Sequence, residues 1–287
     1  MKRFSKIILI LAGFCFLFGT AITVAAASLG GRIPEAVVFN GDWIDYFDHK
    51  YEGFSRREPV KITVNRLGSE EWSAEESGYL KKLNLSVGAA KIRIVEGGAE
   101  DSIYVKDATD YIQWEQNMDE DTLELNFYRD KRFRRHISTE SAYAVLVIPK
   151  GYEFNEVEIQ VGAGVLEAES LTARELDLEG GAGAISINSG KVQELDIDVQ
   201  AGSVVYSGEV GSSLIADCQA GGVELSLKGE PEDFNYELDV NMGSIQIGGQ
   251  EYSGIEKEKT LISDSAVKKA DLHCDVGSIE ITFLGED

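Results

Sequence analysis

Apolar and polar residues alternate along much of the chain after residue 80. Residues 195–199, for example, read Leu-Asp-Ile-Asp-Val. Because successive side chains of a β-strand point to opposite faces, this period of two predicts strands with one aliphatic and one polar face. No segment after residue 31 shows the 3.6-residue period of an amphipathic helix. The pattern therefore predicts an all-β domain.

The predicted strands belong to an internal repeat that is marked by glycine. Four segments, the first starting at Val157, align through glycines spaced 19 residues apart, and two later copies follow at spacings of 22 and 34 residues. A further copy starts earlier, at Leu83. Each copy reads as a short strand, a Gly/Ala corner and a second strand. The aligned glycines are Gly164, Gly183, Gly202, Gly221, Gly243 and Gly277.

Short strands and glycine corners at a period of about 20 residues are typical of the coils of a parallel β-helix. We therefore expect a single-stranded parallel β-helix, or β-solenoid, in which the last copy caps the stack. The sixfold period of the left-handed hexapeptide type is absent, which favours the right-handed type. Glycine is expected at each corner because the bend needs a positive φ or leaves no room for a Cβ atom.

The N-terminus carries a second signal. Residues 7–31 contain no charge, and Lys2, Arg3 and Lys6 precede them. About 20 apolar residues span a bilayer as a helix, so residues 1–31 are predicted to be a signal anchor. A cleaved signal peptide is the alternative, and both interpretations export the rest of the chain. The predicted domains are this transmembrane segment, a juxtamembrane spacer at 32–78 and a repeat domain at 79–287.

Composition narrows the classes of partner. Acidic residues outnumber basic ones by 50 to 27, which gives a formal net charge of −23. A surface this acidic repels phosphate backbones, so no nucleic-acid partner is expected. Three histidines and three cysteines are too few for a disulfide scaffold or a dense metal site. We predict no catalytic residue, no cofactor and no metal site.

One segment breaks the acidic pattern and is the candidate contact for an anion or a partner. Its cations could bind phosphate or carboxylate groups of wall polymers, lipid headgroups or a protein, but internal charge balance is the favoured interpretation. The candidate residues are Arg129, Lys131, Arg132, Arg134 and Arg135.

Outward-facing acidic residues form a second group. Stacked carboxylates can bind Ca²⁺ weakly, although a solvated face is the favoured interpretation. These residues are Asp177, Asp196, Asp198, Asp239, Asp271 and Asp275.

Cys218 and Cys274 both lie three residues before their aligned glycine, where other copies carry valine. If the copies stack in chain order, the coil that contains Val240 separates the two cysteines by about 9.6 Å, which is beyond disulfide range. We therefore expect two buried free thiols.

The segment from Ala144 to Val157 contains the motif Ile-Pro-Lys-Gly and is followed by the Gly-Ala-Gly corners. Together these features resemble the DUF4097 β-strand-repeat family of bacterial envelope proteins. That family is related to the LiaG group, and its members are described as adhesins. The resemblance covers about residues 80–287 and implies an extracytoplasmic β-solenoid with no established activity. We expect a single-pass, membrane-anchored, non-enzymatic binding or envelope-stress accessory protein, secreted if its N-terminal segment is cleaved. Its expected partners are the membrane and an envelope polymer or another membrane protein. The alternative is a cell-wall or polysaccharide-active β-helix lyase or hydrolase, which would show converging Asp, Lys and Arg in a groove.

Overall fold

The computed structural model describes residues 62–63, 80–97, 102–119, 121–130, 132, 139–253 and 257–285. The chain divides into two units, residues 1–43 and 44–287, and all described residues belong to the second. The predicted anchor at 1–31 therefore lies outside the described residues. Within the described ranges, no helix is long and apolar enough to cross a membrane.

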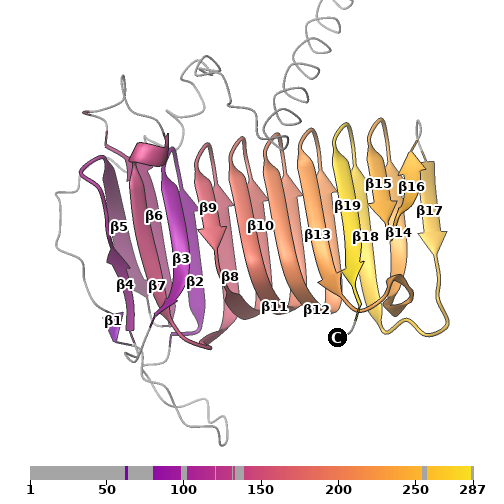
Figure 1. Ribbon diagram of the computed structural model, residues 1–287, viewed down its shortest axis with the longest axis horizontal. Coiled ribbons are helices and arrows are strands. Elements are labelled where there is room, and N and C mark those ends of the chain that lie inside the picture. Colours follow the sequence, from indigo (N-terminus) through magenta and orange to yellow (C-terminus); the bar gives the residue numbers. More distant parts are fainter. Residues whose placement is uncertain are drawn as a thin grey trace, which may run out of the picture. The chain divides into compact units, whose positions relative to one another are not determined.

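The repeat folds into stacked rungs, each made of a strand before a corner, the corner itself and a strand after it (Figure 1). The strands before the corners pair with one another and form the first face. In spatial order these strands are β6 (Thr122–Arg129), β2 (Lys82–Val87), β8 (Glu153–Val161), β10 (Leu171–Gly180), the second half of β11 (Ala184–Val199), the second half of β12 (Ser203–Cys218), β18 (Lys268–Cys274) and β14 (Phe234–Val240).

The strands after the corners form the second face in the same way. In the same order they are β7 (Tyr143–Pro149), β3 (Lys91–Gly97), β9 (Val165–Ala168), the first halves of β11 and β12, β13 (Gly222–Lys228), β19 (Ser278–Leu284) and β15 (Ser244–Ile247). Two short 3-10 helices, η2 (Thr139–Ser141) and η3 (Pro231–Asp233), lie in the connections.

All pairings between rungs are parallel, and their register is regular except for two shifts between β11 and β12. Leu176 pairs with Leu195, and Leu195 pairs with Leu214. Each of these side chains is at most 2% exposed, and the aliphatic residues of both faces form one core cluster. The parallel β-solenoid expected from the alternation is thus the fold of the repeat domain. Its right-handedness stays a prediction.

Both ends of the stack are closed by antiparallel strands. At one end β5 (Ile112–Asp119) pairs with β6, and β4 (Ser102–Lys106) pairs with β7. At the other end β17 (Lys257–Leu261) pairs with β14, and β16 (Gln250–Ser253) pairs with β15. These strands occupy the edges of β6, β7, β14 and β15, which would otherwise present unpaired backbone groups. The short β1 (Ile62–Thr63), which lies within the predicted spacer at 32–78, pairs with β4.

The order of rungs in space differs from the order in the chain. The last copy, β18–β19, lies between β12–β13 and β14–β15, as the yellow strands in Figure 1 show. The first copy, β2–β3, likewise lies between β6–β7 and β8–β9. The expectation that the last copy caps the stack is therefore wrong. Since β16 and β17 occupy the outer edges of β15 and β14, only the inner edges remain for the last rung.

The corners contain glycine because they have no room for a side chain. None of the six predicted corner glycines has a positive φ. A Cβ atom on Gly202 would lie 2.3 Å from the carbonyl oxygen of Gly183, and one on Gly221 would lie 2.2 Å from that of Gly202. In the same way, a Cβ atom on Gly277 would lie 2.2 Å from the carbonyl oxygen of Gly221. One on Gly243 would lie 2.6 Å from the carbonyl oxygen of Gly277. The glycines therefore form a ladder in which each corner lies against the next.

Candidate functional site

The most distinctive surface of the solenoid is a group of six carboxylates on the outer side of the first face. Glu158, Asp177 and Asp196 are in register on three adjacent strands. A second row lies two residues further along the same face. The acidic face, as we call it, consists of Glu158, Asp177, Asp196, Glu179, Asp198 and Asp217.

In-register parallel strands hold these carboxylates at the strand spacing of about 4.8 Å. Other acidic residues are paired with a cation, because Nζ of Lys82 lies 2.5 Å from Oε2 of Glu156 on the first face and Nζ of Lys91 lies 2.7 Å from Oε1 of Glu167 on the second face. Among the described residues, none of the six carboxylates of the acidic face forms an ion pair with a lysine or arginine. The face therefore concentrates negative charge that no lysine or arginine of the described part compensates.

This crowding raises the affinity of the carboxylates for protons. Partial burial, followed by the charge of Asp196 and nearby glutamates, raises the pKa of Asp177 to about 6. Burial and neighbouring carboxylates also raise the pKa of Glu179 and that of Asp196. The pKa of Asp217 is raised by burial, against an opposing effect of His273. A cation placed over this face would relieve the same repulsion that a proton relieves.

Two oxygens in the second row are shielded from solvent and have no partner. The Oδ1 atoms of Asp198 and Asp217 make no hydrogen bond with any group that the structure describes. Over the same described ranges, no three His, Cys, Asp or Glu side chains converge as metal ligands. A flat array of this kind suits an extended partner with several cationic groups better than a single Ca²⁺ ion.

The second row of the acidic face ends at a histidine on β18, which belongs to the intercalated rung, the rung β18–β19 that lies between β12–β13 and β14–β15. His273 lies in register between Asp217 and Asp239. Its Nδ1 atom is 3.1 Å from Oδ2 of Asp239, and its Nε2 atom is 3.2 Å from Oδ1 of Asp275. Burial lowers the pKa of His273, but Asp217, Asp275 and Asp239 together raise it further than burial lowers it. The histidine therefore limits the acidic face on this side.

The basic segment predicted as an anion or partner contact is described only in part. Arg129 is the last residue of β6, where it is half-buried. Arg132 pairs with Asp130, a carboxylate that is 2% exposed and also accepts a hydrogen bond from Gln113 at 3.0 Å. Arg132 thus balances a buried charge. Lys131, Arg134 and Arg135 lie outside the described residues, so an anion contact there stays a prediction.

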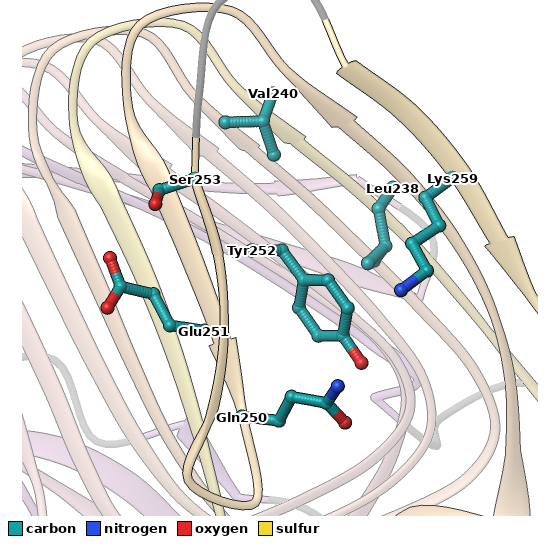
Figure 2. A pocket seen from close by; sticks show the side chains of 7 residues that line it. All are labelled: Leu238, Val240, Gln250, Glu251, Tyr252, Ser253 and Lys259. Atoms are coloured by element: carbon teal, nitrogen blue, oxygen red, sulfur yellow. The ribbon is translucent and has the colours of Figure 1, made fainter.

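A pocket of about 420 Å³ lies beside β14, near the end of the stack (Figure 2). Its apolar wall contains Leu238 and Val240, and the Nζ atom of Lys259 lies 4.4 Å from the centre of the Tyr252 ring. Figure 2 shows Glu251 pointing away from Tyr252, as alternation along β16 requires. The full lining is Leu238, Val240, Gln250, Glu251, Tyr252, Ser253 and Lys259.

The sequence identified only part of the acidic face. Asp177, Asp196 and Asp198 were predicted to face outward and belong to it. Asp239, Asp271 and Asp275, which were grouped with them, lie beyond the rung of Asp217. Ile215, on the rung of Asp217, interrupts the first row, and His273, on the next rung, interrupts the second row. Sequence reasoning missed Glu158, Glu179 and Asp217. Alignment of the repeats contained the signal, because these residues occupy equivalent places in successive copies.

The cysteines correct the expected rung order. Cys218 and Cys274 are both buried and free, as predicted. The predicted separation by the coil of Val240 is wrong, because Cys218 pairs directly with Cys274 and Val240 lies on the far side of Cys274. The intercalated last rung brings the two thiols side by side.

The stacked rungs, glycine ladder and closed ends define an all-β solenoid repeat protein. Residues 149–282 match the family model described as Toastrack DUF4097. The resemblance inferred from the glycine corners and the Ile-Pro-Lys-Gly phrase is therefore confirmed. No curated protein matches the chain.

Two solved structures are similar in part. One is a proposed cell adhesion protein from Clostridium sporogenes, with 15% identity and a TM-score of 0.36 over 79% of this chain and 99% of that one. The other is a proposed adhesin from Bacteroides fragilis, with 13% identity and a TM-score of 0.36 over 79% of this chain and 98% of that one. Similarity at this level supports no conclusion about the fold or the function of this chain.

Proposed function

We propose that the chain is a non-enzymatic binding protein of the cell envelope that contacts cationic groups of its partner through the acidic face. The observation that carries the proposal is the in-register array of six carboxylates, uncompensated by lysine or arginine within the described ranges.

The geometry favours a partner with repeated positive charges. Carboxylates spaced by about 4.8 Å along the stack can engage several ammonium or guanidinium groups of one extended molecule. Each exposed contact is worth only about 0.5 kcal/mol, so affinity depends on the number of contacts made together. The rows on neighbouring strands provide that number without any rearrangement of the backbone.

The proposed location is the outer side of the cell membrane, with the N-terminal segment as anchor. The support is in the sequence, where Lys2, Arg3 and Lys6 precede the uncharged run at residues 7–31. Cationic groups carried by an envelope polymer or by a neighbouring membrane protein would be accessible to the acidic face from this position. The non-enzymatic assignment is part of the same proposal.

The proposal is tested by measuring the affinity of the purified full chain for polylysine. The triple variant Asp177→Asn, Asp196→Asn, Asp198→Asn removes three charges from the acidic face. We expect it to weaken binding by about tenfold, because three contacts of about 0.5 kcal/mol each are lost.

The matched control removes the same number of negative charges elsewhere. Glu224 and Glu280 lie in register on β13 and β19 of the second face, and Glu251 lies on β16; all three are exposed. Glu224→Gln, Glu280→Gln, Glu251→Gln should leave polylysine affinity within about twofold of the parent protein. Equal weakening by both triple variants would mean that only net charge matters, and the acidic face would then not be the binding site.

A further inference from the structure

The two buried cysteines are placed as direct neighbours by the intercalated rung. Cys218 ends β12 and Cys274 ends β18, and the two residues are in register in adjacent parallel strands. Adjacent strands lie about 4.8 Å apart, and disulfide-bonded cysteines have Cα atoms about 4.4–6.8 Å apart. The register therefore places the Cα atoms of the pair within disulfide range.

The sulfur atoms point into the same space under the corners. Each thiol acts on the other, so that the neighbouring thiol lowers the pKa of Cys218 and raises the pKa of Cys274. A Cβ atom on Gly277 would lie 2.6 Å from Sγ of Cys218, and one on Gly243 would lie 2.4 Å from Sγ of Cys274. The glycine ladder thus leaves just enough room for the sulfurs, and both cysteines have zero exposed surface.

We propose that Cys218 and Cys274 are a disulfide site, which is oxidised as the chain folds outside the cytoplasm and covalently fixes the intercalated C-terminal rung. The reduced form is the one that the structure shows. The inference that the chain meets an oxidising environment rests on the location given under Proposed function. The pairing geometry does not depend on that location.

The oxidant is a disulfide, either of a small thiol compound or of a thiol–disulfide oxidoreductase. One cysteine thiolate attacks a sulfur of this disulfide, forms a mixed disulfide and releases the first thiol of the oxidant. The second cysteine thiolate then attacks the protein sulfur of the mixed disulfide and releases the second thiol. Two protein thiols are oxidised to one disulfide, one oxidant disulfide is reduced to two thiols, and the protons of the cysteines pass to the leaving thiolates.

Complete burial determines when this exchange takes place. A mixed disulfide cannot form inside the closed core, so the oxidant must act before β18 and β19 pair with their neighbours. The chain between the two cysteines includes β13, β14, β15, β16, β17 and nearly all of β18, so of the strands beyond β12 only β19 lies outside it. The bond would therefore close a loop around the C-terminal end of the stack and be slow to reduce in the folded protein.

The test starts from purified full chain that is denatured, reduced and then refolded in a mixture of reduced and oxidised glutathione. Remaining thiols are alkylated, and the protein is digested without reduction and mapped by mass spectrometry. We expect a linked pair of peptides, containing Cys218 and Cys274, that is lighter by two hydrogen atoms than the sum of the two thiol peptides. Recovery of both cysteines in alkylated form from folded protein would overturn the proposal.

Matched variants separate pairing from folding. Valine occupies the equivalent place in other copies, including Val199 and Val240, so Cys218→Val and Cys274→Val should fold and should leave the remaining cysteine unlinked. A Cys15→Ser variant removes the third cysteine and should leave the linked peptide unchanged. A link that persists in Cys274→Val, or one that requires Cys15, would overturn the assignment of the pair.

The dependence on cellular location is tested separately by the same mapping of protein recovered from its native membranes. A linked pair in both samples supports the site and the extracytoplasmic location together. A link after refolding, combined with free thiols in the native sample, would overturn oxidation in the cell and count against the proposed location. The acidic face and its binding to polylysine would be unaffected by that outcome.

Discussion

Gly221 and Gly222 are neighbours at one corner, but a methyl group would meet different surroundings at the two positions. A Cβ atom on Gly221 would lie 2.2 Å from the carbonyl oxygen of Gly202 and 2.5 Å from Cγ1 of Val199. On Gly222 the nearest such atom is Oγ of Ser278, at an ordinary contact distance of 3.8 Å. Because neither glycine has a positive φ, Gly221→Ala and Gly222→Ala differ mainly in packing.

The magnitude follows from the overlap with the backbone of the preceding rung. To reach a normal contact, the Gly221 corner must move by about 1 Å away from Gly202, which costs about 1–3 kcal/mol in packing strain. The movement also stretches the hydrogen bonds from Gly222 N to Gly202 O (3.1 Å) and from Ala220 N to Gln200 O (3.0 Å). Each bond contributes about 1 kcal/mol. We therefore expect Gly221→Ala to lower the free energy of unfolding by about 3 kcal/mol.

Gly222→Ala should raise the free energy of unfolding by about 0.5 kcal/mol, because alanine restricts the conformations of the unfolded chain and its methyl group overlaps no atom at this position. Urea denaturation of the purified full chain compares the midpoints and slopes of both variants with the parent protein. A clear fall in the midpoint for Gly221→Ala alone is expected. Equal midpoints for the two variants would show that the corners can relax, and lack of space would not explain the glycine ladder.

Two further predictions concern single carboxylates. Asp177→Asn should stabilise the protein by about 1 kcal/mol at neutral pH, a value discounted for partial exposure. Because folding raises the pKa of Asp177 from 3.8 to about 6, its destabilising effect develops as pH rises between these values, so the difference in urea midpoint should disappear on acidification. Asp130→Asn should destabilise by about 2 kcal/mol at neutral pH, because the buried carboxylate loses its charge-assisted bonds to Arg132. Those bonds lower the pKa of Asp130 below 3.8, so its contribution to stability is fully present above pH 3.8 and is lost as pH falls through the folded-state pKa. Equal urea midpoints for Asp130→Asn and the parent protein at neutral pH would contradict this role.

The local structure of the rungs could be read from the sequence because it depends on short-range patterns. Alternation of aliphatic and polar residues sets which side of a strand faces the core, and the buried Leu195, Ile197 and Val199 follow it directly. The 19-residue spacing locates the corners. The sequence could not show why glycine stands at those corners, because a positive φ and a lack of room for a Cβ atom both predict glycine. The structure shows that the reason is lack of room.

The acidic face illustrates a similar limit. The sequence places Asp177 and Asp196 on the polar side of their strands, but only register reveals that Glu158 extends the same row. The raised pKa of Asp177 also depends on charges from other rungs. The face of a strand to which a side chain points is therefore set by the local sequence, whereas the crowding of charged side chains depends on the tertiary structure.

Each copy of the repeat carries its own pattern of aliphatic residues and glycine, which is enough to predict the strands, the corners and the parallel stacking of rungs. Which rung lies beside which depends on contacts between distant parts of the chain. Every rung presents nearly the same aliphatic face and the same backbone hydrogen-bonding groups to both sides, so the repeat pattern does not specify the neighbour. The antiparallel β16 and β17 occupy one side of β14–β15, and this leaves the gap in which β18–β19 pairs and Cys274 meets Cys218.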